Sequence, residues 1–157
     1  MDKNGRAIYN LKVWEMINRF VDFWKTLNPD PVHVEQFLYS DKHKFAGTTD
    51  LVVKMGDELW MLDIKTSNSL HKTYDMQLAA YSKAYEEITG NKIDRAGIIW
   101  LKSSKRGPGR TKDSYQGAGW EIKFVKDILN NLFTLFRTTA FLSNFADTTT
   151  PSLLIPV

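Results

Sequence analysis

The chain has 157 residues and a formal net charge of +3, and this length predicts one domain with a single substantial hydrophobic core. It contains no cysteine, which excludes a disulfide framework, a thiol nucleophile and a cysteine-bound zinc or iron–sulfur centre. No apolar run is long enough to cross a bilayer and the N-terminal residues show no signal-peptide pattern, so we expect a cytoplasmic protein without membrane contact.

The first 66 residues predict a helix followed by three strands. Asn28-Pro29-Asp30-Pro31 ends the helix because proline disfavours helix in the residue before it. Strands are expected at residues 32–40, 45–54 and 58–66, and the short turn at Gly56 predicts an antiparallel hairpin of the last two. The helix is expected over Arg6–Leu27, and its core-facing stripe is Leu11, Trp14, Ile17, Val21 and Trp24.

The remaining sequence predicts two more helices and two more strands. The expected elements are a helix over Tyr74–Thr89, a buried strand over Arg95–Lys102, a loop over 103–119, a strand over 120–125 and an amphipathic helix over 127–146. In the first of these helices, Leu78, Tyr81, Tyr85 and Ile88 are expected to face inward. This order predicts one α+β domain over residues 1–157, with a mixed, mostly antiparallel sheet flanked by helices and a core at about 32–126.

The hairpin carries an unusual group of charges. Asp63 and Lys65 are two apart in a strand and therefore share a face, while Ile64 points into the other layer. Asp50 lies at nearly the same distance from the turn as Asp63, so the two carboxylates can converge. A surface hairpin with an ordinary Asp–Lys pair is the alternative interpretation.

The apolar surroundings of these charges favour a metal site. Asp50 interrupts a stretch that reads as a buried strand, and Asp63 follows Trp60-Met61-Leu62. Charges in such places are seldom found unless they are paired or bound to a metal. Carboxylate oxygens favour Mg²⁺ or Mn²⁺, which can acidify a bound water and neutralise charge on a phosphate, and an adjacent ammonium can orient that water.

Three segments resemble a known family. They are Phe-Ala-Gly-Thr-Thr-Asp-Leu-Val from residue 45, Leu-Trp-Met-Leu-Asp-Ile-Lys-Thr-Ser from residue 59, and Gln-Leu-Ala-Ala-Tyr from residue 77. Together they are similar to the PD-(D/E)xK nuclease superfamily, and within it to the RecB-like exonucleases that lack an iron–sulfur cluster; the likeness covers about residues 32–101. The resemblance implies a restriction-endonuclease-like core, metal binding by Asp50 and Asp63, catalytic assistance by Lys65, and support of the site and the DNA end by Gln77 and Tyr81.

The sequence leaves open whether the third acidic group of the family is Glu35, Glu15 or absent. RecB-like enzymes carry an acidic residue or histidine on a helix upstream of the sheet, and Glu15 is the acidic residue central to the first helix. A helical wheel puts Glu15 opposite the apolar stripe, which favours a solvent-exposed position. Glu35, in the first strand and on the same face as His33, is the stronger candidate, as a metal ligand or as a structural residue at the end of the sheet.

A basic cluster follows the buried strand. It consists of Lys102, Lys105, Arg106, Arg110 and Lys112, in a Gly- and Ser-rich loop. Next to a nuclease site such a loop can track a phosphate backbone, whereas on its own it would read as a solvated loop.

These features predict a Mg²⁺- or Mn²⁺-dependent deoxyribonuclease, more in keeping with an exonuclease than an endonuclease. Its expected substrate is DNA that is single-stranded or has a free end, in replication, recombination or phage DNA processing, within a bacterial or phage-infected cell. The alternative is a nuclease-like module, weakly active or inactive, that binds DNA or a protein partner. The sequence also leaves open that the chain forms a homo-oligomer.

Overall fold

The computed structural model describes residues 10–103, 109–111, 114–126 and 131–139. The elements in chain order are α1 (Leu11–Leu27), β1 (Asp30–Ser40), β2 (Phe45–Met55), β3 (Glu58–Lys65), α2 (Thr73–Thr89), β4 (Arg95–Trp100), β5 (Gly109–Thr111), β6 (Ser114–Gln116) and β7 (Glu121–Phe124). Residues 131–139 are also helical.

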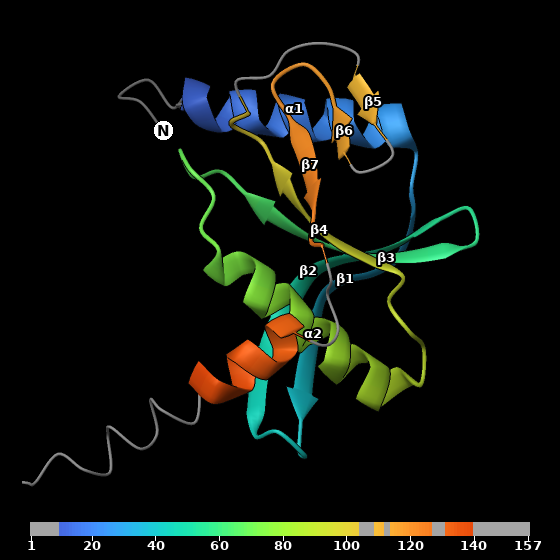
Figure 1. Cartoon of the computed structure of the whole chain (residues 1–157). Helices are drawn as coiled ribbons and strands as arrows, with labels where there is room; N and C mark the ends of the chain where they lie inside the picture. The colour runs from blue at the N-terminus through green and yellow to red at the C-terminus, as the bar shows by residue number, and fades with distance from the viewer. Residues whose placement is uncertain (1–9, 104–108, 112–113, 127–130, 140–157) are drawn as a thin grey trace, which may run out of the picture.

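The strands form a seven-stranded mixed sheet in the order β1-β2-β3-β4-β7-β6-β5. Only β3 and β4 pair in parallel, with α2 as the connection between them, and every other neighbouring pair is antiparallel. Because β3 and β4 run in parallel, both end at the same edge of the sheet, on the left of Figure 1 beneath the N-terminal half of α1. The prediction of a mixed, mostly antiparallel sheet flanked by helices is confirmed.

The sheet separates two apolar layers, with α1 on one face and α2 on the other (Figure 1). Side chains alternate between the faces along each strand, so neighbouring residues enter different layers. On the α2 side, Val52 and Met61 pack with Leu78 and Tyr85. On the α1 side, Leu62 belongs to a cluster with Phe23, Trp60, Ile99 and Trp120.

The helix that covers the second layer is rotated relative to the sequence prediction. Phe23 is fully buried, whereas Leu11, Trp14, Ile17 and Val21 are exposed, with Trp14 at 51 % of its full accessible surface. Arg19 donates to the carbonyl oxygens of Leu101 and Gly119, and Asp22 accepts a hydrogen bond from Trp120 Nε1 at 2.7 Å. The hydrogen bonds of Arg19 and Asp22 fix the rotation of the helix, so that Phe23 faces the sheet while Leu11, Trp14, Ile17 and Val21 face solvent.

Both ends of α1 carry recognisable caps. The Asn10 side chain accepts a hydrogen bond from the Lys12 N–H, so the helix begins at Leu11, and residues 6–9 of the predicted helix lie outside the described part of the chain. Asn28 ends the helix in the left-handed conformation with φ of 46°, and its N–H bonds to the Trp24 carbonyl.

Two further expectations are wrong. The segment 103–119 is not a plain loop, because β5 and β6 form an antiparallel hairpin within it that joins the sheet through β7. Ile88, expected to face inward, is 40 % exposed.

The C-terminal helix can be followed over part of its predicted length. Within residues 131–139, Phe133 is buried against Ala79 and Ala80 of α2, while Leu135 is exposed. The rest of the predicted helix lies outside the described ranges.

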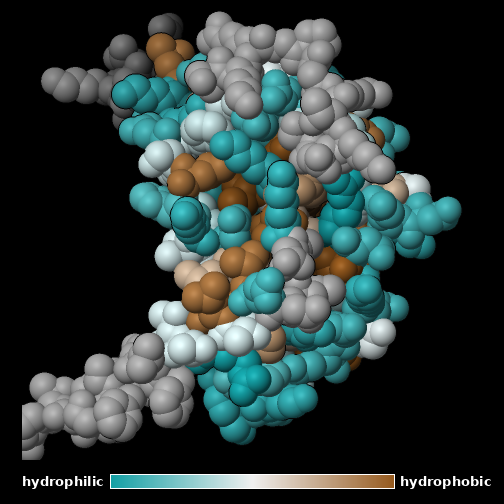
Figure 2. Space-filling view, in the orientation of Figure 1, coloured by the Kyte–Doolittle hydropathy of each residue, from teal (hydrophilic) through white to brown (hydrophobic). Residues whose placement is uncertain are grey.

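Hydrophilic residues dominate the face of the molecule shown in Figure 2, and hydrophobic residues gather in a band across its middle, at the level of the sheet. Over the described residues, the helices are too short or too polar to cross a membrane.

Candidate active site

Asp50 stands where β2 and β3 separate. Backbone pairing between these strands runs from Met55–Glu58 to Leu51–Leu62 and goes no further. One position beyond, the Asp50 side chain replaces the backbone as the acceptor: its Oδ2 accepts a hydrogen bond from the Ile64 N–H at 2.7 Å. The side chain thus continues the ladder and fixes one carboxylate oxygen at the point where the strands open.

Asp63 and Lys65 form an ion pair on β3. Asp63 is only 6 % exposed, and Lys65 Nζ lies 2.6 Å from its Oδ2. Within the described residues the Lys65 ammonium is the polar group that meets this buried oxygen. Burial raises the pKa of the Asp63 carboxyl, the hydrogen bond and charge of Lys65 lower it, and the negative charge of Asp50 raises it further.

Asp50 and Asp63 face the α2 layer. Val52 and Met61, two residues from each in their strands, belong to the core cluster that contains α2 residues. Leu62 and Ile64, the immediate neighbours of Asp63, pack in the opposite cluster, as the sequence alternation predicts. The structure therefore brings the two carboxylates and the lysine together on one side of the sheet.

Helix α2 supplies the wall over this group. Gln77 Nε2 donates to the Tyr81 hydroxyl at 3.0 Å, so these two residues, one turn apart, are connected. The Tyr81 ring occupies the space that a side chain at Gly47 would fill, which sets α2 directly against the strand that carries Asp50. Gly47 can only be glycine here for steric reasons, since its φ is not positive.

Tyr74 is a contributor that the sequence prediction missed. Its ring lies under the Lys65 ammonium at 4.8 Å, a cation–π contact that holds the lysine from the α2 side. The available signal was the spacing of Tyr74, Gln77 and Tyr81, which at intervals of three and four places them on one helix face.

The candidates for a third acidic group are not gathered with the two aspartates. Glu35 falls opposite Asp50 in the register, between the pairs Val34–Leu51 and Gln36–Thr49, but its backbone leaves strand conformation with φ of 51° and it is exposed. His33 instead packs edge-on against Tyr85, with ring centroids 5.7 Å apart.

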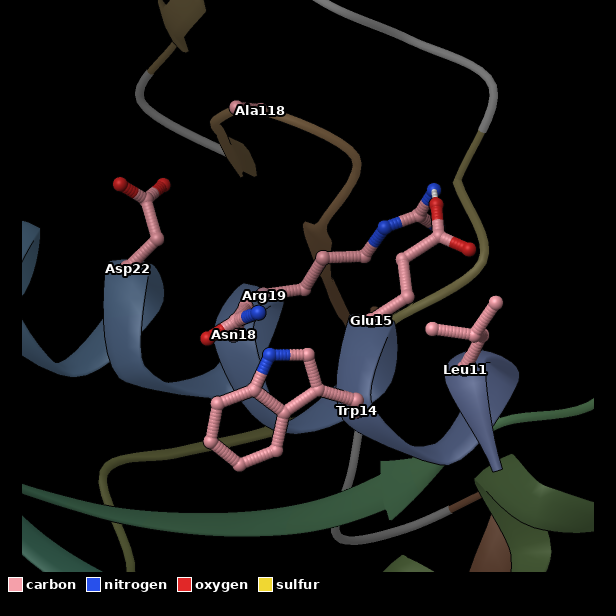
Figure 3. A pocket seen from close by; sticks show the side chains of 7 residues that line it. All are labelled: Leu11, Trp14, Glu15, Asn18, Arg19, Asp22 and Ala118. Carbon is pink, nitrogen blue, oxygen red and sulfur yellow. Dashed lines mark hydrogen bonds and ion pairs between the residues drawn. The ribbon is translucent and has the colours of Figure 1, made fainter. Parts of the chain in front are cut away.

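Glu15 is paired with a residue of its own helix. It forms an ion pair with Arg19, which reaches back along the helix toward it (Figure 3). Both residues line a shallow groove of about 440 Å³ on α1, beside the exposed Leu11 and Trp14. The expectation that Glu15 is solvent-exposed is confirmed, at 53 % exposure of its side chain.

Only part of the predicted basic cluster can be placed. Lys102 lies just past the end of β4, and its Nζ donates to the Asn68 side-chain oxygen at 3.1 Å. Arg110 belongs to β5, but its side chain is outside the described part of the chain, as are Lys105, Arg106 and Lys112 altogether.

The donor set fits a hard divalent cation. Asp50 accepts from the Ile64 N–H through Oδ2, and the buried Oδ2 of Asp63 lies beside the Lys65 ammonium, so two carboxylates and one cationic group meet in this site. Two carboxylates are what Mg²⁺ commonly takes from a protein, with the remaining ligands from water and phosphate. No set of three acidic, histidine or cysteine side chains among the described residues is arranged to hold a metal.

Comparison with known proteins bears on this site. The family model described as the PD-(D/E)XK nuclease superfamily matches residues 5–141, which include the β2–β3 hairpin and the whole of α2. Curated proteins give no significant match. Because the match covers most of the chain, this protein belongs to the PD-(D/E)XK nuclease superfamily.

Proposed function

We propose that this chain is a metal-dependent deoxyribonuclease and that it acts as an exonuclease. The observation that carries the proposal is the convergence of Asp50, Asp63 and Lys65 in a partly buried site where β2 and β3 separate. Burial raises the pKa of the Asp63 carboxyl, and a desolvated carboxylate beside a second carboxylate and an ammonium is typical of functional sites. Membership of a nuclease superfamily supports the proposed nuclease activity.

In this proposal Asp50 and Asp63 hold Mg²⁺ or Mn²⁺. Such a cation would supply positive charge that polarises the phosphodiester and acidifies water. Lys65 extends from the same face as Asp63, so its ammonium orients the attacking water or balances the charge that develops on the phosphate oxygens. The water oxygen forms the new bond to phosphorus and the bond to the 3′ oxygen breaks, which leaves a 5′-phosphate end.

The exonuclease assignment depends on α2. Gln77 and Tyr81 are joined by a hydrogen bond and stand over the strand that carries Asp50. Their spacing resembles that of enzymes that act at DNA ends, so we assign them to positioning of the terminal nucleotides. The substrate would be DNA that is single-stranded or has a free end, in recombination, replication or phage DNA processing.

Cleavage of end-labelled DNA tests the assignment. Linear single- and double-stranded DNA and closed circular DNA are incubated with the protein in Mg²⁺, Mn²⁺ or EDTA. We expect metal-dependent loss of label from linear DNA, and a drop of about 10²–10³-fold or more in rate for Asp63→Asn and for Lys65→Gln.

The matched controls are Asp57→Asn and Lys54→Gln, which make the same changes at exposed positions of the same hairpin. Undiminished cleavage in both site variants would refute the proposed roles. Equal cutting of circular and linear DNA would refute the exonuclease assignment while leaving the nuclease standing.

One observation favours a second candidate, a module that binds DNA or a partner and cuts weakly or not at all. The described residues offer two converging carboxylates and no third acidic or histidine ligand. Glu35 lies opposite Asp50 in the register but is exposed, so its side chain would have to turn toward the aspartates to serve as a third ligand. Glu35→Gln should then reduce cleavage at least tenfold, and DNA binding without cleavage in any metal would favour the inactive module.

A further inference from the structure

A second polar pocket lies at the edge of the sheet where β3 and β4 end. It has a volume of about 560 Å³, a size that suits a small ligand or a nucleotide. In Figure 1 this edge is on the left, beneath the N-terminal half of α1. The residues that line the pocket are Lys12, Glu15, Met16, Arg19, Asn68, Lys102 and Ser103.

The charges of this pocket do not cancel. Arg19 is held in place by the Leu101 carbonyl at 2.6 Å and the Gly119 carbonyl at 3.3 Å, and its charge is balanced by Glu15. Lys12 and Lys102 are exposed, and neither forms an ion pair with another described residue. Two ammonium groups therefore remain for an anion from outside the chain.

The pocket lies on the α1 side of the strand ends whose α2 side carries the candidate active site. The Leu101 N–H donates to the Lys65 carbonyl at 2.9 Å, so the next residue, Lys102, lies just beyond the end of β3 that carries Asp63 and Lys65. Asn68 follows Lys65 by three residues, a span of at most about 11 Å along the chain. DNA rises about 3.4 Å per nucleotide, so a strand with its scissile phosphate at Asp63 reaches the pocket within a few nucleotides.

We propose that this pocket binds a backbone phosphate of the DNA strand, a few nucleotides from the bond that is cut. The Lys12 and Lys102 ammonium groups carry the charge recognition, and the Asn68 side chain, already bonded to Lys102, holds that lysine over the pocket. Arg19 fixes the position of α1 against the ends of β4 and of the segment before β7, and so sets the width of the pocket. This inference rests on the proposed action on DNA.

Binding measured without cleavage tests the pocket directly. A fluorescent single-stranded oligonucleotide is titrated in EDTA with Lys12→Gln/Lys102→Gln and with the wild-type chain, over a series of salt concentrations. We expect about tenfold weaker binding at low salt and a salt slope reduced by about 1, since a phosphate contact is lost. In cleavage assays KM should rise by the same factor while kcat at saturation stays unchanged.

The matched control is Lys25→Gln/Lys54→Gln, which removes two exposed lysines outside the pocket and changes the net charge equally. Binding and salt slope equal to this control would overturn the pocket proposal, even where Asp63-dependent cleavage is intact. A lysine-dependent salt slope in a chain that never cleaves would support the pocket and refute the nuclease. The two failures are thereby distinguished.

Discussion

Both faces of the sheet are covered by an apolar layer, but they differ at the end of β3. Toward α1, Leu62 and Ile64 enter a layer of apolar and aromatic side chains. Toward α2, the intervening Asp63 and the following Lys65 stand beside Asp50. A one-residue step along β3 thus changes a packing position into a candidate catalytic one.

This difference bears on how much each residue at the end of β3 contributes to the stability of the fold. Burial of the Asp63 carboxyl is unfavourable enough to raise its pKa, and the ion pair with Lys65 offsets only part of that cost. At the neighbouring position no charge is buried, because Leu62 is apolar and packs in a cluster with large residues, among them Phe23 and Trp120. We infer that the apolar packing of Leu62 and its neighbours stabilises β3 in the geometry that Asp63 and Lys65 use.

Truncation in the α1 layer should have the largest effect on stability. Leu62→Ala truncates a side chain that is only 1 % exposed. We expect the free energy of unfolding to fall by about 2–5 kcal/mol. Urea denaturation measures it. Below the unfolding transition the variant should still cleave DNA with the wild-type metal requirement.

Asp63→Asn is the matched comparison at the next residue, and it should unfold no more easily than the wild type while losing cleavage. The division between the faces would be broken if Asp63→Asn destabilised the fold as much as Leu62→Ala. The milder Leu62→Val keeps the comparison available if Leu62→Ala does not fold.

The contact between Gly47 and Tyr81 joins the two elements of the α2 side, and a methyl group there should disturb both. Gly47→Ala places a Cβ in the space of the Tyr81 ring, so the ring must move away from β2 and from its hydrogen bond with Gln77. We expect a loss of about 1–3 kcal/mol in unfolding free energy, together with reduced cleavage.

A double-mutant cycle with Tyr81→Ala isolates this contact. In the Tyr81→Ala background Gly47→Ala should be nearly neutral, because the ring that it displaces is gone. Equal costs in both backgrounds would place the effect of the methyl group elsewhere in β2.

The pattern of the β2–β3 hairpin was the most predictable part of the molecule. Alternation along β3 set Asp63 and Lys65 on one face and Ile64 on the other, and the short turn at Gly56 fixed the pairing that brings Asp50 near. These are local rules, with a period of two and one turn, and they need no information about distant residues.

The orientation of α1 was not predictable for the opposite reason. Its apolar arc is too wide to show which edge faces the sheet, and the choice is made by Arg19 and Asp22 through Leu101, Gly119 and Trp120, about 80 to 100 residues away. The β5–β6 hairpin was missed because strands of three residues in a Gly- and Ser-rich segment carry too few side chains to show alternation.

The pH dependence of stability should reveal the cost of burying the charged Asp63 carboxylate on the α2 side. Because the pKa of Asp63 is raised in the folded state, the folded chain binds more protons than the unfolded one above the ordinary value of 3.8. Asp63 therefore favours folding most at low pH, and this contribution is lost as the pH rises from about 3.8 through the raised pKa.

Asp63→Asn removes this titration, so in EDTA the variant should gain stability relative to the wild type as the pH rises, up to a plateau. Thermal unfolding at a series of pH values measures the difference. Asp75, whose pKa burial also raises, is present in both proteins and cancels. A difference that did not vary with pH would contradict the desolvation of Asp63.

The smallest expected effect concerns the residue before Asp50. Thr49 is 1 % exposed, and within the described residues its hydroxyl has no hydrogen-bond partner. Thr49→Val replaces that hydroxyl with a methyl group of similar size, so we expect a gain of about 1 kcal/mol in unfolding free energy by urea denaturation. The exposed Thr48→Val is the control and should change stability by less than about 0.5 kcal/mol. A gain in stability with reduced cleavage would assign the Thr49 hydroxyl to the site beside Asp50. The same gain with unchanged cleavage would make it a buried polar group without a role in cleavage, and a loss of stability would contradict its lack of a partner.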